Sequence, residues 1–167
     1  MRTLTAAFLA LTFAAAPAAA RAGWFVEGSL GQGWEYKPDH VRQPLNVMVT
    51  PGYQILDVLS LECGAVATFA NVKDSKFDVQ LRPMAELSIP LFPIYAKAIL
   101  GITGLADNPV KIQYGGALGG RFGLAGVGVF LEAGLLPTNV QVKDATTGAT
   151  SNQLIWIAEG RLGLRFG

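Results

Sequence analysis

Long runs of this sequence alternate between apolar and polar residues with a period of two. In the run 76–89, KFDVQLRPMAELSI, the odd-numbered residues are apolar and the even-numbered residues carry nearly all of the polarity. Successive side chains on a β-strand point to opposite faces, so this run predicts a strand between an apolar and a polar medium. The same alternation recurs in the runs 24–36, 45–55, 59–69, 94–103, 110–124, 127–137 and 154–166. The helical spacing of three and four is absent from these runs, so the pattern predicts an all-β fold with eight strands.

The connections between the eight runs differ in length. Those after the first, third, fifth and seventh runs are polar or rich in turn residues: KPDHVRQ, NVKDS, GLADNP and TNVQVKDATTGATSN. Those after the second, fourth and sixth runs are minimal, at Leu56–Asp57, PLFP and Ala125–Gly126. Short periplasmic turns that alternate with longer outer loops are typical of transmembrane barrels. The pattern therefore predicts an antiparallel up-and-down barrel with both termini on the periplasmic side.

The first 22 residues have the features of a cleaved secretory signal peptide. Arg2 is followed by the apolar run LTAAFLALTFAAAPAAA and by Ala20-Arg21-Ala22, a small-x-small cleavage site. A transmembrane anchor is the alternative, but the apolar run is short and rich in alanine. We therefore expect an exported protein with one domain at 23–167.

Composition excludes several classes of function. The formal net charge is +1, which argues against nucleic acid as a partner. His40 is the one histidine and Cys63 the one cysteine, so the chain has no ligand set for a metal and no internal disulfide. We expect neither a metal nor a cofactor.

Two architectures fit eight amphipathic strands: a soluble lipid-binding barrel with the apolar set inside, and an outer-membrane barrel with that set facing lipid. The runs exceed the ~5 to 6 residues of globular strands and match the ~9 to 11 that a tilted membrane strand needs. Aromatic residues gather near the strand ends on the apolar face, as in interfacial girdles: Trp24, Trp34, Tyr36, Tyr53, Tyr114, Trp156 and Phe166. Both features favour the membrane barrel.

Charge placement favours the membrane barrel most strongly. Nine charged residues fall on the polar parity of the strands: Glu27, Glu62, Arg82, Glu86, Lys97, Arg121, Glu132, Glu159 and Arg161. Each Arg or Lys that faced the middle of the bilayer would cost ~2 to 4 kcal/mol, so these side chains are predicted to point into the lumen. There, five acids would face four bases.

An eight-stranded barrel has an interior that side chains fill, so we expect no open channel. Counted from the short turns, Glu27, Glu62, Glu86, Lys97 and Arg121 lie at similar depth, and the other four charged residues lie higher. Antiparallel counting across PLFP sets Glu86 opposite Lys97. The near balance of signs favours a salt-bridged plug, while a proton or ion path and acid–base chemistry stay open. Pro51 and Pro83 cannot donate to a strand ladder, so we expect a bulge or weakened pairing at each.

The sequence resembles the small eight-stranded outer-membrane barrels, the OmpA-type transmembrane domains and their stand-alone relatives. Its final strand alternates Gly160, Leu162, Leu164 and Phe166 toward a C-terminal aromatic. The resemblance implies the bacterial outer membrane as location, its lipid and lipopolysaccharide as surroundings, and recognition of the last strand by the outer-membrane assembly machinery.

The function predicted from these observations is non-enzymatic: an integral outer-membrane barrel with a plugged lumen, contributing to envelope structure or to interactions of its surface loops. The loop at 138–152 is the best contact surface, and its partner is unknown. One alternative is an enzyme resembling lipid A acyltransferase, with His40, Asp74 and Ser75 on adjacent outer loops as its catalytic residues. The other alternative is a soluble, exported lipid-binding barrel.

Overall fold

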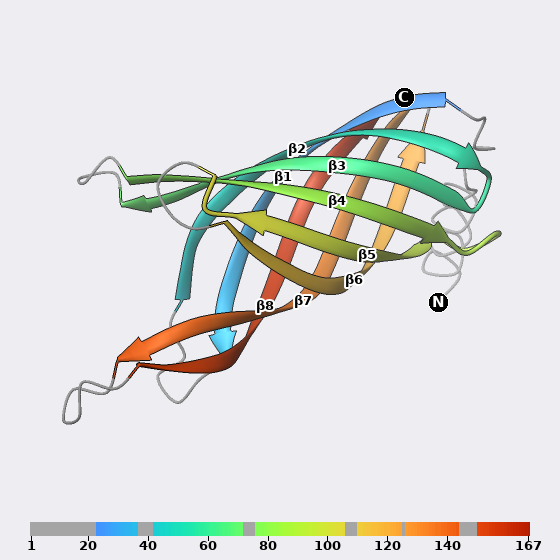
Figure 1. Cartoon of the computed structure of the whole chain (residues 1–167). Coiled ribbons are helices and arrows are strands. Elements are labelled where there is room, and N and C mark those ends of the chain that lie inside the picture. The colour runs from blue at the N-terminus through green and yellow to red at the C-terminus, as the bar shows by residue number, and fades with distance from the viewer. Residues whose placement is uncertain (1–22, 37–41, 72–75, 106–109, 125, 144–149) are drawn as a thin grey trace, which may run out of the picture.

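A computed structural model describes residues 23–36, 42–71, 76–105, 110–124, 126–143 and 150–167. Its strands are β1 (Gly23–Tyr36), β2 (Arg42–Leu56), β3 (Leu59–Asn71), β4 (Lys76–Ser88), β5 (Ile94–Thr103), β6 (Lys111–Leu124), β7 (Val127–Lys143) and β8 (Thr150–Phe166). Each strand pairs with its neighbours in sequence, and β1 pairs with β8, so the sheet closes into an antiparallel barrel (Figure 1). The predicted all-β, eight-stranded, up-and-down fold is confirmed. No helix in the described segments is both long enough and apolar enough to cross a membrane.

The strands are tilted relative to the barrel axis. A row of paired residues that starts at Gly23 and crosses every strand returns to β1 at Gly33, ten residues further along, after passing Gln54, Ser60, Glu86, Lys97, Ala117, Gly134 and Glu159. Closing a sheet with such an offset forces the strands to tilt. Residues in one row of paired positions therefore lie at different depths in the barrel.

The two ends of the barrel differ in their connections. Three short connections, at 57–58, 89–93 and 125–126, lie at one end, which we call the turn end. Gly126 has a φ of 82°, and its carbonyl accepts a hydrogen bond of 3.1 Å from the amide of Gly167, which ties the last residue to the β6–β7 turn. The other end, the loop end, carries the connections 37–41, 72–75, 104–110 and 144–149. These have four to seven residues, against two, five and two at the turn end, so the contrast in length is weaker than the sequence predicts.

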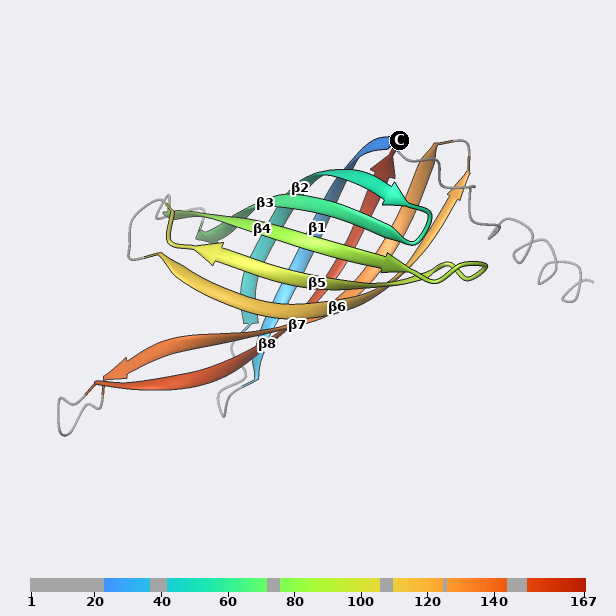
Figure 2. The same cartoon turned by 45° about the vertical axis from the view of Figure 1, so that its right-hand side comes forward.

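The prediction of a loop at 138–152 is wrong for most of that segment. β7 continues to Lys143 and β8 begins at Thr150, with unbroken pairing from Thr138 with Ile155 to Lys143 with Thr150. The segment Asn139-Val140-Gln141-Val142-Lys143 also alternates, and its valines favour strand, so the hairpin grows beyond the barrel wall. Figures 1 and 2 show this β7–β8 hairpin leaving the direction of β5 and β6 at the loop end. Only 144–149 remains as a connection, and it lies outside the described residues.

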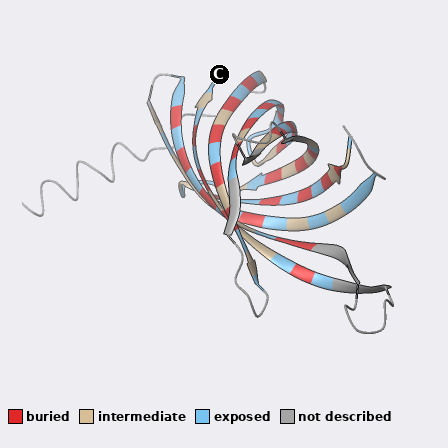
Figure 3. Cartoon of the chain, turned by 90° about the vertical axis from the view of Figure 1, so that its left-hand side faces the viewer, coloured by how far each residue is buried: buried red, intermediate tan, exposed pale blue. Residues whose placement is uncertain are grey.

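Burial alternates along the strands with the polar set inside. In β5 every second residue is buried, including Tyr95, Lys97 and Ile99, while the residues between them are exposed (Figure 3). Leu131 on β7 is 65% exposed, whereas Arg82 on β4 is 7% exposed. The orientation is the one that the charge pattern predicts. The soluble alternative, with its apolar set inside, is wrong because the leucines that it would bury lie on the outer surface.

Both predicted weak points coincide with gaps in the ladders. The β2–β3 pairs run to Val49 with Ala65 and resume at Gly52 with Glu62, which leaves out Pro51. The β4–β5 pairs pass from Leu81 with Ile102 to Met84 with Ile99, leaving out Pro83. The register is unchanged across each gap, so each proline weakens the pairing without a bulge.

A third proline, Pro137, ends the ladder between β6 and β7. It is the last residue of the seventh run that the sequence predicts. The last pair is Gly116 with Leu135, although β6 continues to Lys111 and β7 to Lys143. The carbonyl oxygen of Leu135 lies only 2.3 Å from where a Cβ on Gly115 would sit, so it points toward β6. Alternate residues of a strand direct their backbone groups to the same side, so the nitrogen of Pro137 also faces β6 and has no hydrogen to donate. The two strands are unpaired from this seam to the loop end.

Candidate functional site

All nine charged residues predicted to face the lumen do so. Eight are buried, at 7% exposure or less: Glu27, Glu62, Arg82, Glu86, Lys97, Glu132, Glu159 and Arg161. The side chain of Arg121 is 19% exposed. The structure adds a tenth, Arg165 of β8, whose side chain is 11% exposed. Its position on the polar parity of the last strand was the signal for it, but the sequence analysis left it out of the network.

Lys97 is the centre of a cluster near the turn end, the lower cluster. Its Nζ lies 3.1 Å from Glu27, 2.9 Å from Glu62, 3.6 Å from Glu86 and 3.3 Å from Glu132. The predicted register of Glu86 opposite Lys97 is confirmed. The Lys97 side chain has no exposed surface, so one ammonium group holds four carboxylates that come from four other strands.

Two of these carboxylates, Glu27 and Glu86, are shared by two arginines on the turn side of the cluster. Arg121 donates two hydrogen bonds to Glu86, of 3.0 and 2.5 Å, and one of 3.0 Å to Glu27. Arg165 lies 3.4 Å from Glu86 and 3.6 Å from Glu27. A bidentate arginine–carboxylate pair is stronger and more directional than a single contact to an ammonium. Glu86 is therefore held mainly by Arg121, and its 3.6 Å contact with Lys97 is secondary.

Aromatic rings complete the lower cluster. The Tyr95 hydroxyl donates to Glu132 at 3.2 Å, and its ring lies under the Arg121 guanidinium at 4.6 Å and near Lys97 Nζ at 5.2 Å. Arg165 stacks on Phe25 at 3.4 Å. These faces stabilise cations where water is excluded. Glu132 belongs to this cluster, 3.3 Å from Lys97 Nζ, and does not lie higher, as counting from the turns predicted.

A second cluster, the upper cluster, lies nearer the loop end. Arg82 Nη1 contacts Glu159 Oε2 at 2.6 Å, and Arg161 is paired with the other oxygen of the same carboxylate. Asn46 donates to Glu159 at 3.1 Å and accepts from Arg161 at 2.6 Å. Ser29 also accepts a hydrogen bond from Arg161, at 3.3 Å. Asn46 and Ser29 were missed as members of the site because short polar side chains on inward positions carry no charge signal.

An apolar cluster fills the lumen beside these charges. Its members are Met48, Val66, Met84, Ile99, Ala117 and Leu136. Met84 and Ile99 each stand two residues toward the loop end from Glu86 and Lys97. The lower cluster is therefore bounded on that side by apolar side chains, which exclude water and strengthen its ion pairs.

The ten described charges of the two clusters balance as a set but not within each cluster. The lower cluster has four carboxylates against Lys97, Arg121 and Arg165, whereas the upper cluster has Arg82 and Arg161 against Glu159 alone. Within the described residues, Glu62 Oε1 and Thr50 Oγ1 are buried without a hydrogen-bond partner. Glu62 is thus the least well satisfied member of the ring around Lys97.

The cluster has the carboxylate spacing of a cation site, but an ammonium fills it. Oxygens of Glu27, Glu62 and Glu86 lie within 4.8 Å of one another. Lys97 Nζ is within 3.6 Å of all three. The arrangement holds four strands together through one positive charge, which is a structural role. The proposed catalytic residues His40, Asp74 and Ser75 lie outside the described residues.

The aromatic residues predicted to form girdles lie at the two ends of the outer surface. Trp24 pairs with Tyr53 at the start of β1, with ring centroids 5.1 Å apart, and Phe166 lies opposite Val26. At the end of β1, Trp34 lies opposite Ala158 and Tyr36 opposite Trp156. All seven are exposed, from Tyr53 at 39% to Trp24 at 76%: Trp24, Trp34, Tyr36, Tyr53, Tyr114, Trp156 and Phe166. The exposed rings thus form one group near the turn end and another toward the loop end.

Comparison with known proteins supports the fold alone. No family model and no curated protein matches the sequence. Among solved structures, the barrel is similar to the crystal structure of Neisserial surface protein A, an eight-stranded outer-membrane barrel, with a TM-score of 0.60. The match covers 88% of this chain and 99% of that chain at 13% sequence identity. The predicted resemblance to small eight-stranded outer-membrane barrels is confirmed in architecture.

Proposed function

We propose that this chain is a non-enzymatic, integral outer-membrane barrel whose lumen is plugged by ion pairs. One observation carries the proposal: the polarity of the fold is inverted, with ten charged side chains directed inward and large apolar side chains exposed around the outside. Leu118, Leu131 and Leu162 are 66%, 65% and 58% exposed. Apolar surface on this scale is destabilising in water and is what hydrocarbon requires of a barrel.

The paired lumen supports a structural role over a conducting one. On the side of β4 and β5 the lower cluster is bounded by the apolar side chains of Met84 and Ile99. Its charges are engaged with one another at 2.5 to 3.6 Å. The protein contributes to envelope structure, and the strands of the β7–β8 hairpin extend beyond the barrel wall, where they can contact other molecules.

The expected partners follow from the same placement. Lipid and lipopolysaccharide surround the apolar belt, and the assembly machinery binds the last strand, whose Leu162, Leu164 and Phe166 are outward and exposed. Export depends on the signal peptide at 1–22, which lies outside the described residues. The acyltransferase alternative rests on His40, Asp74 and Ser75 alone, and no described contact favours it.

Two substitutions to arginine at different depths on the outer face test the proposal. Leu131→Arg places a charge on the outer face in the middle of the strands, where Leu131 pairs with Leu162. Val110→Arg places the same charge at the edge of the loop end, where Val110 is 60% exposed. In a membrane the first should cost ~2 to 4 kcal/mol and the second ~0 to 1 kcal/mol, because the penalty falls toward the interface. The readouts are the urea midpoint in lipid vesicles and the recovery of heat-modifiable protein in the outer-membrane fraction.

The outcome separates the two environments. A large loss for Leu131→Arg together with a small one for Val110→Arg supports membrane insertion. Equal, small effects, or recovery of the unaltered protein from the periplasm without detergent, would show that water surrounds the barrel.

A further inference from the structure

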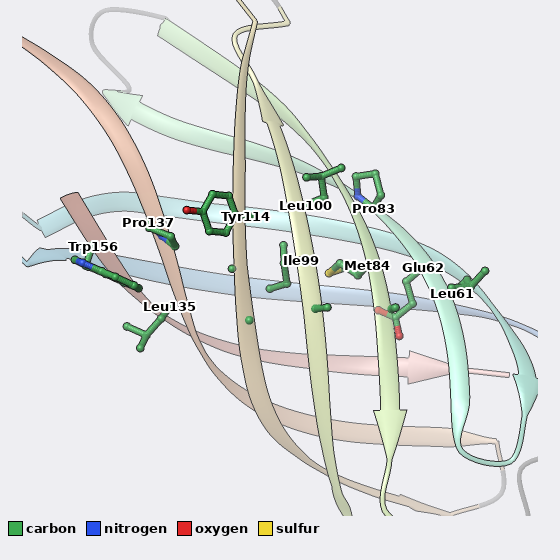
Figure 4. Close-up of a pocket in the computed structure, with 14 residues that line it drawn as sticks. Leu61, Glu62, Pro83, Met84, Ile99, Leu100, Tyr114, Leu135, Pro137 and Trp156 are labelled. Carbon is green, nitrogen blue, oxygen red and sulfur yellow. The ribbon is translucent and has the colours of Figure 1, made fainter. Parts of the chain in front are cut away.

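The outer surface of the barrel is interrupted by a groove of about 740 Å³ that crosses β4, β5 and β6 (Figure 4). Its floor is a row of paired small residues, Ala85 with Ala98 and Ala98 with Gly116. The row is flanked by larger side chains, among them Leu100, Tyr114 and Leu135. Since i and i+2 positions of a strand stand ~6.6 Å apart, three small residues in line leave a trough one side chain deep.

The groove runs obliquely from near the turn end toward the loop end. Leu61 closes it at one end, and Tyr114, Pro137 and Trp156 surround the other (Figure 4). Strand tilt places the β6–β7 end of this row nearer the loop end than the β3–β4 end. That end meets the seam where Pro137 stops the β6–β7 ladder, so the wall is locally open beside two aromatic rings.

We propose that this groove holds one acyl chain of an outer-leaflet membrane lipid, with the polar end of the lipid at Tyr114 and Trp156. The inference rests on the proposed function, because it takes hydrocarbon to be the surrounding medium. Three features select this occupant. The lining is apolar apart from Glu62, the trough is one side chain deep and is lengthened across the strands, and the rings that carry polar groups stand at its loop end. A chain with an apolar body and one polar end matches that order.

A second copy of the barrel is a weaker match to the same surface. In an apolar dimer interface between membrane strands, large side chains of one copy would pack against small residues of the other. Here exposed side chains flank the trough on both sides. On the side toward the turn end, in the next outward row, Leu87 is 57% exposed and Leu118 is 66% exposed. These would hold a convex partner off the floor, whereas a flexible chain passes between them.

The test compares two substitutions on the outer face of β5. Ala98→Leu fills the floor of the groove, and Ala96→Leu adds the same atoms one outward position away, outside it. Both are made in a protein whose only tryptophan is Trp156, with Trp24→Phe and Trp34→Phe. The detergent-solubilised barrel is titrated with phosphatidylcholine brominated on its acyl chains, and quenching of Trp156 reports the docked chain.

A saturable quenching curve is expected for the reference protein and for Ala96→Leu. Its midpoint should rise about tenfold in Ala98→Leu, equivalent to ~1.4 kcal/mol of lost affinity. Equal midpoints in the two leucine variants would overturn the proposal. So would a detergent-resistant dimer that Ala98→Leu dissociates, because a second copy would then occupy the groove. Heat-modifiable mobility of each variant monitors the barrel itself, so failure of the lipid site is distinguishable from failure of membrane insertion.

Discussion

The turn end and the loop end of this barrel are held together by different forces. At the turn end the strands are joined by short connections, and Lys97, Arg121 and Arg165 link carboxylates from four strands. At the loop end the β6–β7 ladder has stopped at Gly116 and Leu135, and the β7–β8 hairpin leaves the wall (Figure 2). The lower cluster thus reinforces the end of the barrel at which the β6–β7 ladder is intact.

The difference shows where a fold of this kind can tolerate missing backbone hydrogen bonds. Pro137 withholds an amide near the loop end, where Tyr114 and Trp156 mark the expected boundary between lipid and water. An unpaired backbone group is costly in hydrocarbon and much less so at an aqueous edge. Charge pairing is concentrated instead in the lower cluster, where water is excluded and ion pairs are strong.

Removing the centre of the lower cluster should have the largest effect. Lys97→Met leaves Glu27, Glu62, Glu86 and Glu132 without their shared cation, and breaking a buried pair costs ~3 to 5 kcal/mol. We expect a much lower urea midpoint in lipid vesicles, or failure to reach the heat-modifiable form. Lys111→Met, at the exposed start of β6, is the matched control and should leave the midpoint unchanged. Equal midpoints for the two variants would show that the ring around Lys97 does not hold the turn end together.

Glu86→Ala should lower stability less than Lys97→Met does. The loss should come from Arg121, not from Lys97 as the sequence suggests. Counting residues predicts that Lys97 is left unpaired, but three other carboxylates remain within 3.3 Å of it. The group that loses most is Arg121, which still has Glu27 at 3.0 Å and is partly exposed, so we expect a loss of ~1 to 3 kcal/mol.

Double-mutant cycles would identify the partner of Glu86. The coupling energy of Glu86 with Arg121 should exceed that with Lys97, because the first pair makes two hydrogen bonds and the second a single 3.6 Å contact. A larger coupling energy with Lys97 would make Lys97 the main partner of Glu86, as the sequence alone implied.

The smallest effect concerns the backbone of the projecting hairpin. The amides of Asn139, Gln141 and Lys143 share the direction of Pro137, toward β6, where the ladder has ended, while those of Val140 and Val142 face β8. Amide hydrogen exchange followed by NMR should therefore alternate, fast at the odd positions and slow at the even ones. In the middle of β7, at 128–134, both parities should be slow. Uniform protection from 138 to 143 would mean that the seam closes.

The sequence was sufficient to predict the barrel because one period-two signal recurs in all eight strands and each charge reinforces it. It was sufficient for the pairing of Glu86 with Lys97 because a short connection fixes the register of two adjacent strands. The sequence was not sufficient to predict the depth of Glu132 in the lumen, because that depth depends on the tilt of the closed sheet. The bidentate hold of Arg121 on Glu86 also joins nonadjacent strands, and no local pattern encodes it.

The loop end was harder to predict for a different reason. The polar residues of Asn139-Val140-Gln141-Val142-Lys143 suggested a loop, yet two valines at a period of two are a strand signal that continues the hairpin. Pro137 is the last residue of the seventh run that the sequence predicts. In the structure it ends the pairing on one side only, and β7 continues on the other, with β8.

The central claim is that lipid surrounds the outside of the barrel and ion pairs fill its interior, and Cys63 allows a direct test. It is the only cysteine, it is exposed, and it points outward near the middle of β3. A nitroxide on Cys63 in lipid vesicles should collide often with oxygen and rarely with a water-soluble nickel chelate, because oxygen concentrates in hydrocarbon. Frequent collision with the nickel chelate and little with oxygen would place Cys63 in water and contradict the account.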